Sequence, residues 1–360
     1  MAQAANGKNV KGHTSLIIPA GGSSKRFPNM RPKWMLTHPH GRLMIEEVIA
    51  GLDIEFYDEC HIVILKQHCE QYDADQVIKQ ALGDKFKVTI LDEQTSCSPE
   101  TVYECIKRNN IQGQIVVKDC DCLVEFNNAN AENYVVGLDI HNQPIRNLVS
   151  KSFIKLDDNE LISSIVEKQV VSDIVCLGVY SIDSKIFVDS YEKLVKVVDQ
   201  TRLGELYLSH VVSDAILRGH KFNYVTCDKY IDWGTAEEWF KYTSSLKTYI
   251  FDIDGVLLKN VGKYGAKNWS NYFEPLEENI QVLKDLSNKG AEIIFITSRT
   301  EEYLHEFKSY LNVIGIRYKT IISGCNHNKR IIINDHSRTN PYPSCESISL
   351  PRNANIEDYL

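Results

Sequence analysis

The chain lacks the features that mark membrane and secreted proteins. No apolar run approaches the roughly 20 residues needed to cross a bilayer. Residues 1–13 carry neither the apolar stretch nor the Arg-rich pattern of a targeting segment. The ten cysteines are scattered, without the paired CxxC spacing of a zinc site, which favours reduced thiols. These absences predict a soluble, cytoplasmic protein with a frayed tail at residues 1–13.

The chain also lacks an excess of positive charge. Its formal net charge is −8, and its lysines and arginines do not gather into a basic face. This excludes a nucleic-acid partner held by bulk electrostatics. Low-complexity tracts and internal repeats are missing too. The 360 residues, of which 43% are hydrophobic, are long for one core and favour about two globular domains.

What the sequence does contain is an alternation of strand-like and helix-like segments. Short apolar runs predict strands, and a segment at residues 43–52 predicts a helix between two of them. This interleaving is typical of an α/β layer structure with a largely parallel sheet. A further helix is predicted at residues 204–218. The predicted strands are residues 15–19, 61–65, 87–91, 114–117, 134–138 and 175–182.

The pattern stops in a short polar stretch at residues 244–247, after a predicted helix at 235–242. We therefore predict a first domain at residues 14–246 and a second, smaller α/β domain at residues 247–360. The second domain contains predicted strands at 249–253, 292–297, 319–323 and 330–334, and helices at 276–289 and 301–312.

A glycine-rich loop at residues 20–27, AGGSSKRF, follows the first strand. Glycines let backbone N–H groups approach phosphate oxygens, and Lys25 and Arg26 add positive charge. The spacing matches neither the phosphate loop of nucleotide hydrolases nor the dinucleotide fingerprint. Such a loop alone is often a plain turn, so its assignment as a phosphate-binding loop depends on the motifs that accompany it.

Several motifs do accompany it. An acidic pair, Asp119 and Asp121, follows the strand at 114–117. The others are Pro32 with Lys33, Glu167 with Lys168 in SSIVEKQVV, Gly178 with Tyr180 in CLGVYSI, and Asp232 in KYIDWGTAEEW. In this combination and order, residues 16–239 resemble the sugar-nucleotidyltransferase family. Its members join a nucleoside triphosphate to a phosphorylated small molecule.

The resemblance implies a Mg²⁺-dependent transfer reaction. The attacking phosphate is already anionic, so the site needs charge neutralisation and alignment more than a general base. Asp121 and Asp232, together with Asp119, would hold Mg²⁺. Lys168 would hold the phosphate of the second substrate. The triphosphate would be wrapped by Ala20, Gly21, Gly22, Ser24, Lys25 and Arg26, with Lys33 beside them, and Arg26 and Lys33 would be catalytic.

The implied partners are a nucleoside triphosphate, CTP or UTP, and a phosphorylated sugar or polyol. One departure from the family is Ser24, which stands where glycine is usual, so its Cβ is expected to narrow the approach to the triphosphate. Two of these residues also have purely structural interpretations. Asp232 would only cap the helix that begins at Thr235, and Lys168 would only lie on a solvent-exposed strand.

A second site is predicted in KTYIFDIDGVLL, residues 247–258. Asp252 and Asp254 stand two residues apart at the end of a buried strand, where carboxylates are costly unless a cation or a reaction needs them. The segment is followed by ITSR at 296–299 and IIINDH at 331–336. Together these motifs make residues 248–335 resemble the haloacid dehalogenase superfamily of phosphatases.

By this second resemblance, Asp252 is the nucleophile that forms an aspartyl-phosphate, and Asp254 is the acid/base. Thr297 and Ser298 would bind the phosphoryl group. Mg²⁺ would be held by Asp252, Asp254 and Asp335. The phosphate would be clamped by Lys329, with Lys319 as the alternative. Only residues 259–275 separate the DxD turn from the next helix, which predicts a minimal cap.

The leading hypothesis is a bifunctional enzyme with two Rossmann-like α/β domains, the first built on a mixed sheet and the second on a smaller parallel one. It would transfer a nucleotidyl group to a phosphorylated sugar or polyol and hydrolyse a phosphomonoester. By analogy, this pairing suggests surface-glycan precursor synthesis. Two alternatives stay open: a transferase with an inactive scaffold or oligomerisation domain, and a nucleotide-sensing domain fused to an active phosphatase. A homo-oligomer is also possible.

Overall fold

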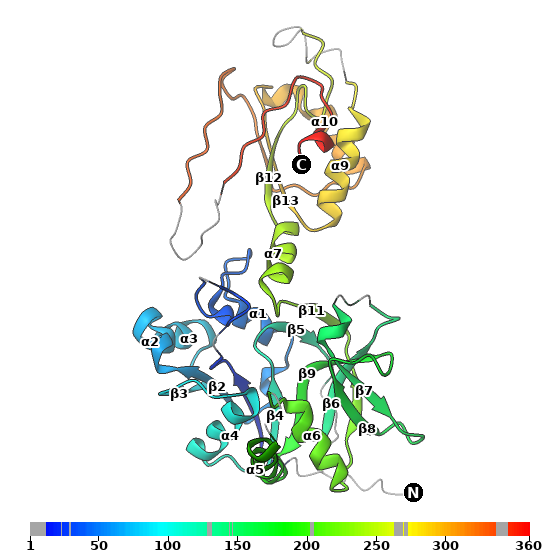
Figure 1. Cartoon of the computed structure of the whole chain (residues 1–360). Coiled ribbons are helices and arrows are strands. Elements are labelled where there is room, and N and C mark those ends of the chain that lie inside the picture. Colours follow the sequence, from blue (N-terminus) through cyan, green and yellow to red (C-terminus); the bar gives the residue numbers. More distant parts are fainter. Residues whose placement is uncertain are drawn as a thin grey trace, which may run out of the picture. The chain divides into compact units, whose positions relative to one another are not determined.

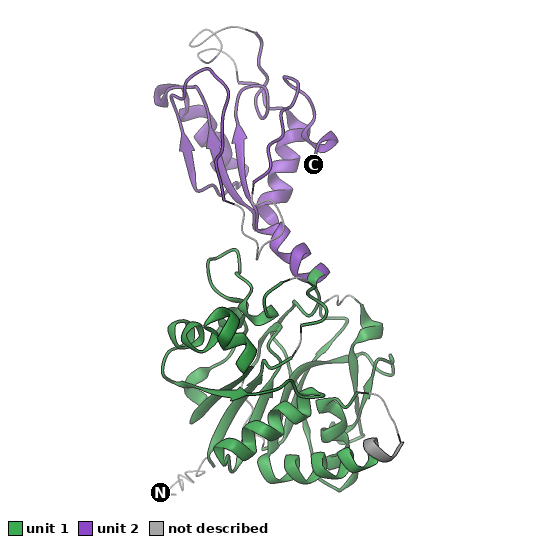
Figure 2. Ribbon diagram, turned by 60° about the vertical axis from the view of Figure 1, so that its left-hand side comes forward, with its two compact units in different colours: residues 1–236 green, residues 237–360 purple. Residues whose placement is uncertain are grey.

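The chain forms two compact units in a computed structural model, unit 1 at Met1–Ala236 and unit 2 at Glu237–Leu360 (Figure 2). Helix α7 (Ala236–Ser245) therefore lies almost wholly in unit 2, and the predicted boundary after residue 246 falls at its end. Most of the predicted tail, residues 1–11, lies outside the described residues. The structure describes residues 12–22, 24–28, 30–127, 132–143, 145, 147–201, 205–262, 269, 273–335 and 345–360.

Unit 1 is built on a nine-stranded mixed sheet. Its strands follow the order β10-β6-β9-β4-β1-β2-β3, and β7 pairs with β8 and β9. Strands β4, β1, β2 and β3 run parallel, whereas β9 is antiparallel to both β4 and β6. The strands are β1 (Thr14–Pro19), β2 (Glu59–Leu65), β3 (Phe86–Leu91), β4 (Gln114–Lys118), β6 (Tyr134–Asp139), β7 (Ser152–Leu156), β8 (Ile162–Glu167), β9 (Ile174–Asp183) and β10 (Asn223–Thr226). The prediction of a mixed α/β sheet is confirmed.

Helices α4 (Ser98–Asn109), α5 (Ser184–Thr201) and α6 (Leu208–Leu217) gather on one side of this sheet (Figure 1). Their buried apolar side chains, such as Val102 and Val211, form one core with Ile17 of β1 and Val117 of β4. The remaining helical segments of unit 1 are η1 (Lys33–Met35), α1 (Met44–Ala50), η2 (Ile54–Phe56), α2 (Lys66–Tyr72), α3 (Ala74–Leu82) and η3 (Leu148–Ser150). Of the helices that the structure describes, none is both long and apolar enough to span a membrane.

A two-stranded ribbon that the sequence did not predict connects distant parts of unit 1. Strands β5 (Cys122–Glu125) and β11 (Lys229–Asp232) pair antiparallel, with Asp232 opposite Cys122. The backbone N–H of Trp233 donates to the carbonyl of Asp121 at 2.9 Å. This register brings Asp232 beside the acidic pair that follows β4.

Unit 2 contains three parallel strands in the order β12-β13-β14. Apolar side chains of the strands and helices, such as Phe251, Leu283, Phe295 and Phe307, form its core. The elements are β12 (Thr248–Asp252), α9 (Glu277–Asn288), β13 (Glu292–Ile296), η4 (Glu301–Tyr303), α10 (His305–Val313), β14 (Thr320–Ile322) and η5 (Ile356–Asp358). Of the predicted minimal cap at residues 259–275, residues 263–268 and 270–272 lie outside the described part.

The predicted strand at residues 330–334 is wrong. The segment is not paired into the sheet, and Ile331, Ile332 and Ile333 are 75%, 51% and 92% exposed. Isoleucine favours strands because it packs well on a pleated, half-buried surface, but a strand also needs a neighbour to bond to its backbone. The composition of this segment therefore predicted a strand that the fold does not form.

Candidate active sites

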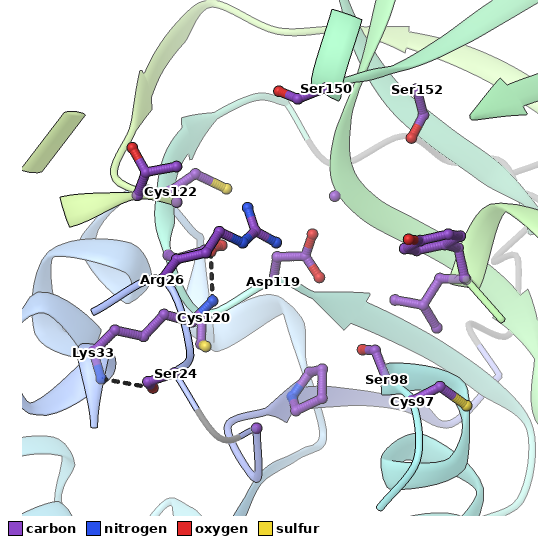
Figure 3. A pocket seen from close by; sticks show the side chains of 18 of the residues that line it. Ser24, Arg26, Lys33, Cys97, Ser98, Asp119, Cys120, Cys122, Ser150 and Ser152 are labelled. Carbon is purple, nitrogen blue, oxygen red and sulfur yellow. Dashed lines mark hydrogen bonds and ion pairs between the residues drawn. The ribbon is translucent and has the colours of Figure 1, made fainter. Parts of the chain in front are cut away.

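A cavity of about 920 Å³ in unit 1 lies at the carboxyl ends of β1 and β4, which are adjacent and parallel. The carboxyl edge of parallel strands is the usual place for ligands in α/β proteins. The side chains of Arg26, Lys33 and Asp119 are directed into this space, with Cys97 and Ser98 on another wall (Figure 3). The predicted site residues that line it are Ala20, Gly22, Ser24, Lys25, Arg26, Lys33, Asp119, Asp121, Lys168 and Asp232.

Gly21 is the member of the predicted loop that does not line this cavity. A Cβ at Gly21 would lie 3.6 to 3.9 Å from side-chain atoms of Leu65, Thr101 and Leu91. The residue therefore packs against the interior, beneath the loop.

Lys33 and Asp121 form a close ion pair in the cavity wall. The distance from Lys33 Nζ to Asp121 Oδ2 is 2.6 Å, and the two side chains are 22% and 16% exposed. Burial acts to lower the pKa of Lys33, but the neighbouring Asp121 carboxylate outweighs it and raises that pKa. Burial acts to raise the pKa of Asp121, but the Lys33 ammonium lowers it further. Both groups are therefore charged.

Asp119 is positioned by Gly178 of β9. The backbone N–H of Asp119 donates to the carbonyl of Gly178 at 2.9 Å, and its carboxylate lies against the Gly178 Cα. Burial, and then the charge of Asp121, raise the pKa of Asp119. Gly178 has a φ of +70°, and a Cβ built on it would collide with Asp119 Oδ2 and lie only 2.7 Å from Asp119 Cγ. Only glycine leaves room for the carboxylate in this position.

Replacing Gly178 by alanine is expected to lower the free energy of unfolding by more than the roughly 1–3 kcal/mol of backbone strain alone, because the carboxylate must also move. Gly219→Ala is the matched control, since Gly219 has a φ of +91° but a Cβ built on it would meet nothing within 4 Å. Urea denaturation of both variants separates the two contributions. Equal losses of stability would contradict the proposed clash with Asp119.

The carboxylates of Asp232 and Asp121 lie close to each other, next to Gly234. A Cβ on Gly234 would lie 3.1 Å from Asp232 Oδ1, 3.4 Å from Asp121 Oδ2 and 3.9 Å from Arg26 Nη1. Asp232 also forms an ion pair through Oδ2 with Lys151, and each of these two side chains is 17% exposed. The cavity thus holds two carboxylates close together, each already paired with a lysine.

Ser24 adopts a left-handed backbone conformation, which glycine adopts readily. Its φ is +49°, and its Oγ accepts a hydrogen bond from the backbone N–H of Lys33 at 3.1 Å. This bond joins the glycine-rich loop to η1, which carries Lys33. Ser24 therefore helps to hold Lys33 in place, in addition to the narrower approach to the triphosphate that its Cβ was expected to cause.

Replacing Ser24 by alanine is expected to destabilise the protein by about 1 kcal/mol, because the strained φ stays while the Lys33 N–H loses its acceptor. Ser24→Gly loses the same hydrogen bond but relieves the backbone strain, so its effect is expected to be smaller. Thermal denaturation of the two variants checks the order of their stabilities. A glycine variant less stable than the alanine variant would be inconsistent with a strained serine.

Lys168 directly follows β8 and lines the cavity. Its φ is +55°, and its Nζ lies 2.5 Å from the hydroxyl of Tyr207, which in turn donates to Glu205. The hydrogen bond to Tyr207 raises the pKa of Lys168. Glu167 contacts Ser152 at 2.7 Å. Sequence reasoning singled out Lys168 but missed Tyr207, Glu205 and Lys151, because no local motif surrounds them.

The second predicted site lies at the carboxyl ends of β12 and β13 in unit 2. Asp252 ends β12 opposite Ile296, so Thr297 is the next residue on the adjacent parallel strand. Thr297 is fully buried, and its hydroxyl accepts from the backbone N–H of Arg299 at 3.1 Å. The expectation of a buried strand is wrong here, because β12 is largely exposed and Asp252 is itself exposed. Partial burial, and then Asp254, raise the pKa of Asp252, whereas Arg330 lowers it.

Arg299 holds Asp254 in a bidentate ion pair that the sequence did not predict. Its Nε lies 3.1 and 2.9 Å from the two carboxylate oxygens, and its Nη2 lies 2.7 Å from Oδ1. The two side chains are 3% and 13% exposed. Both oxygens of Asp254 are therefore directed at a guanidinium.

The other predicted residues of unit 2 are spread more widely. Ser298 accepts from Arg330 at 3.3 Å, near Asp252. Lys319 instead pairs with Glu292 at 2.6 Å, at the opposite end of the sheet from Asp252. Lys329 and Asp335 are exposed, and both flank the unpaired segment at 330–334.

The sequence matches no protein-family model and no curated protein at a significant level. Solved structures do resemble it. A nucleoside-diphosphate-sugar pyrophosphorylase from Vibrio cholerae is 20% identical, with a TM-score of 0.55 over 64% of this chain and 99% of its own. An inositol-1-phosphate CTP transferase from T. maritima is 12% identical, with a TM-score of 0.52 over 64% of this chain and 95% of its own. The chain therefore shares its larger fold with these two proteins.

Proposed function

We propose that unit 1 transfers a nucleotidyl group from a nucleoside triphosphate to a phosphorylated sugar or polyol and releases pyrophosphate. The observation that carries this proposal is the convergence, in one cavity of about 920 Å³, of a glycine-rich loop, five cationic side chains and three aspartates. The cations are Lys25, Arg26, Lys33, Lys151 and Lys168, and the aspartates are Asp119, Asp121 and Asp232. The fold shared with a pyrophosphorylase and a CTP transferase supports the same assignment.

We propose that carboxylates of unit 1 would hold Mg²⁺. Asp121 Oδ2 and Asp232 Oδ1 both lie within 3.4 Å of the position that a Cβ on Gly234 would take. Carboxylate oxygens are the ligands that Mg²⁺ prefers in proteins. Asp121 and Asp232, with Asp119 next to them, would therefore hold it. When bound, Mg²⁺ would neutralise part of the triphosphate charge.

The proposed reaction is an in-line substitution at the α-phosphorus. An oxygen of the acceptor phosphate forms a bond to that phosphorus, while the bond to the bridging oxygen breaks and pyrophosphate leaves with the electron pair. Lys168 orients the acceptor phosphate, and Arg26 and Lys33 offset the charge on the triphosphate. The acceptor phosphate is already an anion, so alignment and charge neutralisation supply the rate.

The walls near Lys168 suit a hydroxyl-rich acceptor. Glu167, Glu205 and Tyr207 place two carboxylates and a phenol beside the Lys168 ammonium, and all four residues line the cavity. Carboxylates accept hydrogen bonds from sugar or polyol hydroxyls, while the lysine binds the phosphate. As the nucleotide, we propose CTP or UTP.

A pyrophosphate-release assay tests this function. The whole protein is incubated with Mg²⁺, each nucleoside triphosphate in turn, and a panel of phosphorylated sugars and polyols. We expect pyrophosphate only when both substrates are present, and with one base favoured. Tight nucleotide binding without pyrophosphate across the panel would instead favour a nucleotide-sensing domain.

For unit 2 we propose hydrolysis of a phosphomonoester, because Asp252 and the residue before Thr297 pair at the carboxyl edge of two parallel strands, with Arg330 nearby. Asp252 would attack the phosphorus and form an aspartyl-phosphate as the ester oxygen leaves with the electron pair; water would then attack the phosphorus, displace the Asp252 carboxylate and release inorganic phosphate. The predicted metal set does not fit here. Arg299 holds both oxygens of Asp254, and Asp335 is exposed beyond an unpaired segment, so we derive no step through a metal.

A further inference from the structure

Lys151 has no place in either motif set, yet it lines the cavity of the proposed transfer site. It precedes β7 and forms an ion pair with Asp232 Oδ2, and its Nζ lies 3.4 Å from the Tyr230 hydroxyl. Its side chain is only 17% exposed. A lysine this enclosed loses most of its rotamer freedom, so the contact fixes a cation at a defined point of the cavity.

The backbone places Lys151 beside the proposed acceptor-binding lysine. Its carbonyl accepts the N–H of Lys168 at 2.9 Å, because β7 and β8 pair with Ser152 opposite Glu167. The two ammonium groups then diverge, one to Asp232 and the other to Tyr207. Lys151 thus stands between the residue proposed to bind the acceptor phosphate and the carboxylates proposed to bind the metal.

Both of those carboxylates are paired with lysines, Asp121 with Lys33 and Asp232 with Lys151. A divalent cation that approaches Asp232 alone meets an ammonium at short range and is repelled by it. A bound triphosphate changes this balance, since its oxygens offer the lysine a new anionic partner. Nucleotide binding is therefore expected to favour metal binding, because a Lys151 ammonium that pairs with the triphosphate no longer occupies Asp232.

We propose that Lys151, which pairs with Asp232, is a catalytic residue whose ammonium moves to the phosphate oxygens when the substrates bind. This inference rests on the proposed nucleotidyl transfer in unit 1. In its second position the ammonium lies where the acceptor phosphate meets the α-phosphate. There it offsets the negative charge while the new P–O bond forms and pyrophosphate leaves.

The test compares Lys151→Met with Lys151→Arg in two measurements on the whole protein. The first is Mn²⁺ binding to the nucleotide-free protein by electron paramagnetic resonance. Removing the ammonium is expected to tighten Mn²⁺ binding about tenfold, as for a short-range charge contact, whereas arginine keeps it near the wild-type value. The second is the kcat of transfer, which is expected to fall about 10²-fold in Lys151→Met and to be partly restored in Lys151→Arg.

The opposite directions of these two effects separate a catalytic cation from a structural contact. Unchanged Mn²⁺ affinity in a Lys151→Met protein that melts like the wild type would overturn the inference. So would a lower affinity for the acceptor with unchanged kcat. If the wild type transfers no nucleotide, the proposed function fails, whatever the role of Lys151. The Mn²⁺ measurement still tests the pairing in that case, since an unchanged Mn²⁺ affinity in Lys151→Met would overturn the effect of Lys151 on the metal-binding carboxylate. Lys151→Gln, a neutral side chain that keeps polar character, replaces Lys151→Met if the latter does not fold.

Discussion

Replacing Asp232 by asparagine is expected to lower the kcat of nucleotidyl transfer about 10²–10³-fold, the range found when one preorganised charge contact is removed from a transition state. A Cβ built on Gly234 would lie 3.1 Å from Asp232 Oδ1 and 3.4 Å from Asp121 Oδ2, so the two carboxylates lie close together. An amide there keeps the shape but not the charge that the proposed metal and Lys151 need. Steady-state pyrophosphate release measures the loss.

Asp228→Asn is the matched control for this variant. Asp228 is exposed and comes just before β11, and its backbone N–H donates to the carbonyl of Glu125 on β5. The substitution removes one negative charge near the site without touching the cavity, so transfer is expected to stay near the wild-type rate. Equal losses in both variants would mean that net charge, and not the position of the carboxylate, determines activity.

Replacing Asp252 by asparagine is expected to abolish phosphomonoester hydrolysis, because an amide cannot form the aspartyl-phosphate. Nucleotidyl transfer is expected to be unchanged, since Asp252 lies in unit 2 and the proposed transfer site lies in unit 1. Release of inorganic phosphate from a panel of sugar and polyol phosphates measures the first effect. Pyrophosphate release measures the second.

Asp285→Asn, an exposed position on α9 of the same unit, is the control for this substitution. It is expected to leave both activities unchanged. If the wild type and both variants release no phosphate, unit 2 has a scaffold or oligomerisation role instead. Hydrolysis that persists in Asp252→Asn would assign the chemistry to another nucleophile.

The parts of the site that the sequence predicted are those whose chemistry leaves a local pattern. Asp119 with Asp121, and Asp252 with Asp254, follow apolar runs directly, and the structure places both pairs at the carboxyl ends of strands. Six strands of unit 1 were recognisable because each is a short apolar run, whereas β5, β7, β8, β10 and β11 were not predicted. Local composition therefore sufficed for those six.

The parts that were missed depend on pairings between distant residues. Lys151 meets Asp232, 81 positions away, only because of the registers of β5 with β11 and of β7 with β8. The isoleucines at residues 331–333 show the converse, since their strand propensity was strong but the fold provides them with no partner strand. Arg299 was read as part of a motif, but its ion pair with Asp254 depends on how β12 and β13 end side by side.

The most direct test of the central claim is ³¹P NMR of the whole protein with Mg²⁺, the favoured nucleoside triphosphate and its phosphorylated acceptor. Nucleotidyl transfer predicts that the γ- and β-phosphate signals of the triphosphate convert to pyrophosphate while an equal amount of a diphosphate-linked product appears. Inorganic phosphate without any diphosphate-linked product would contradict transfer in unit 1 and leave hydrolysis as the activity of this chain.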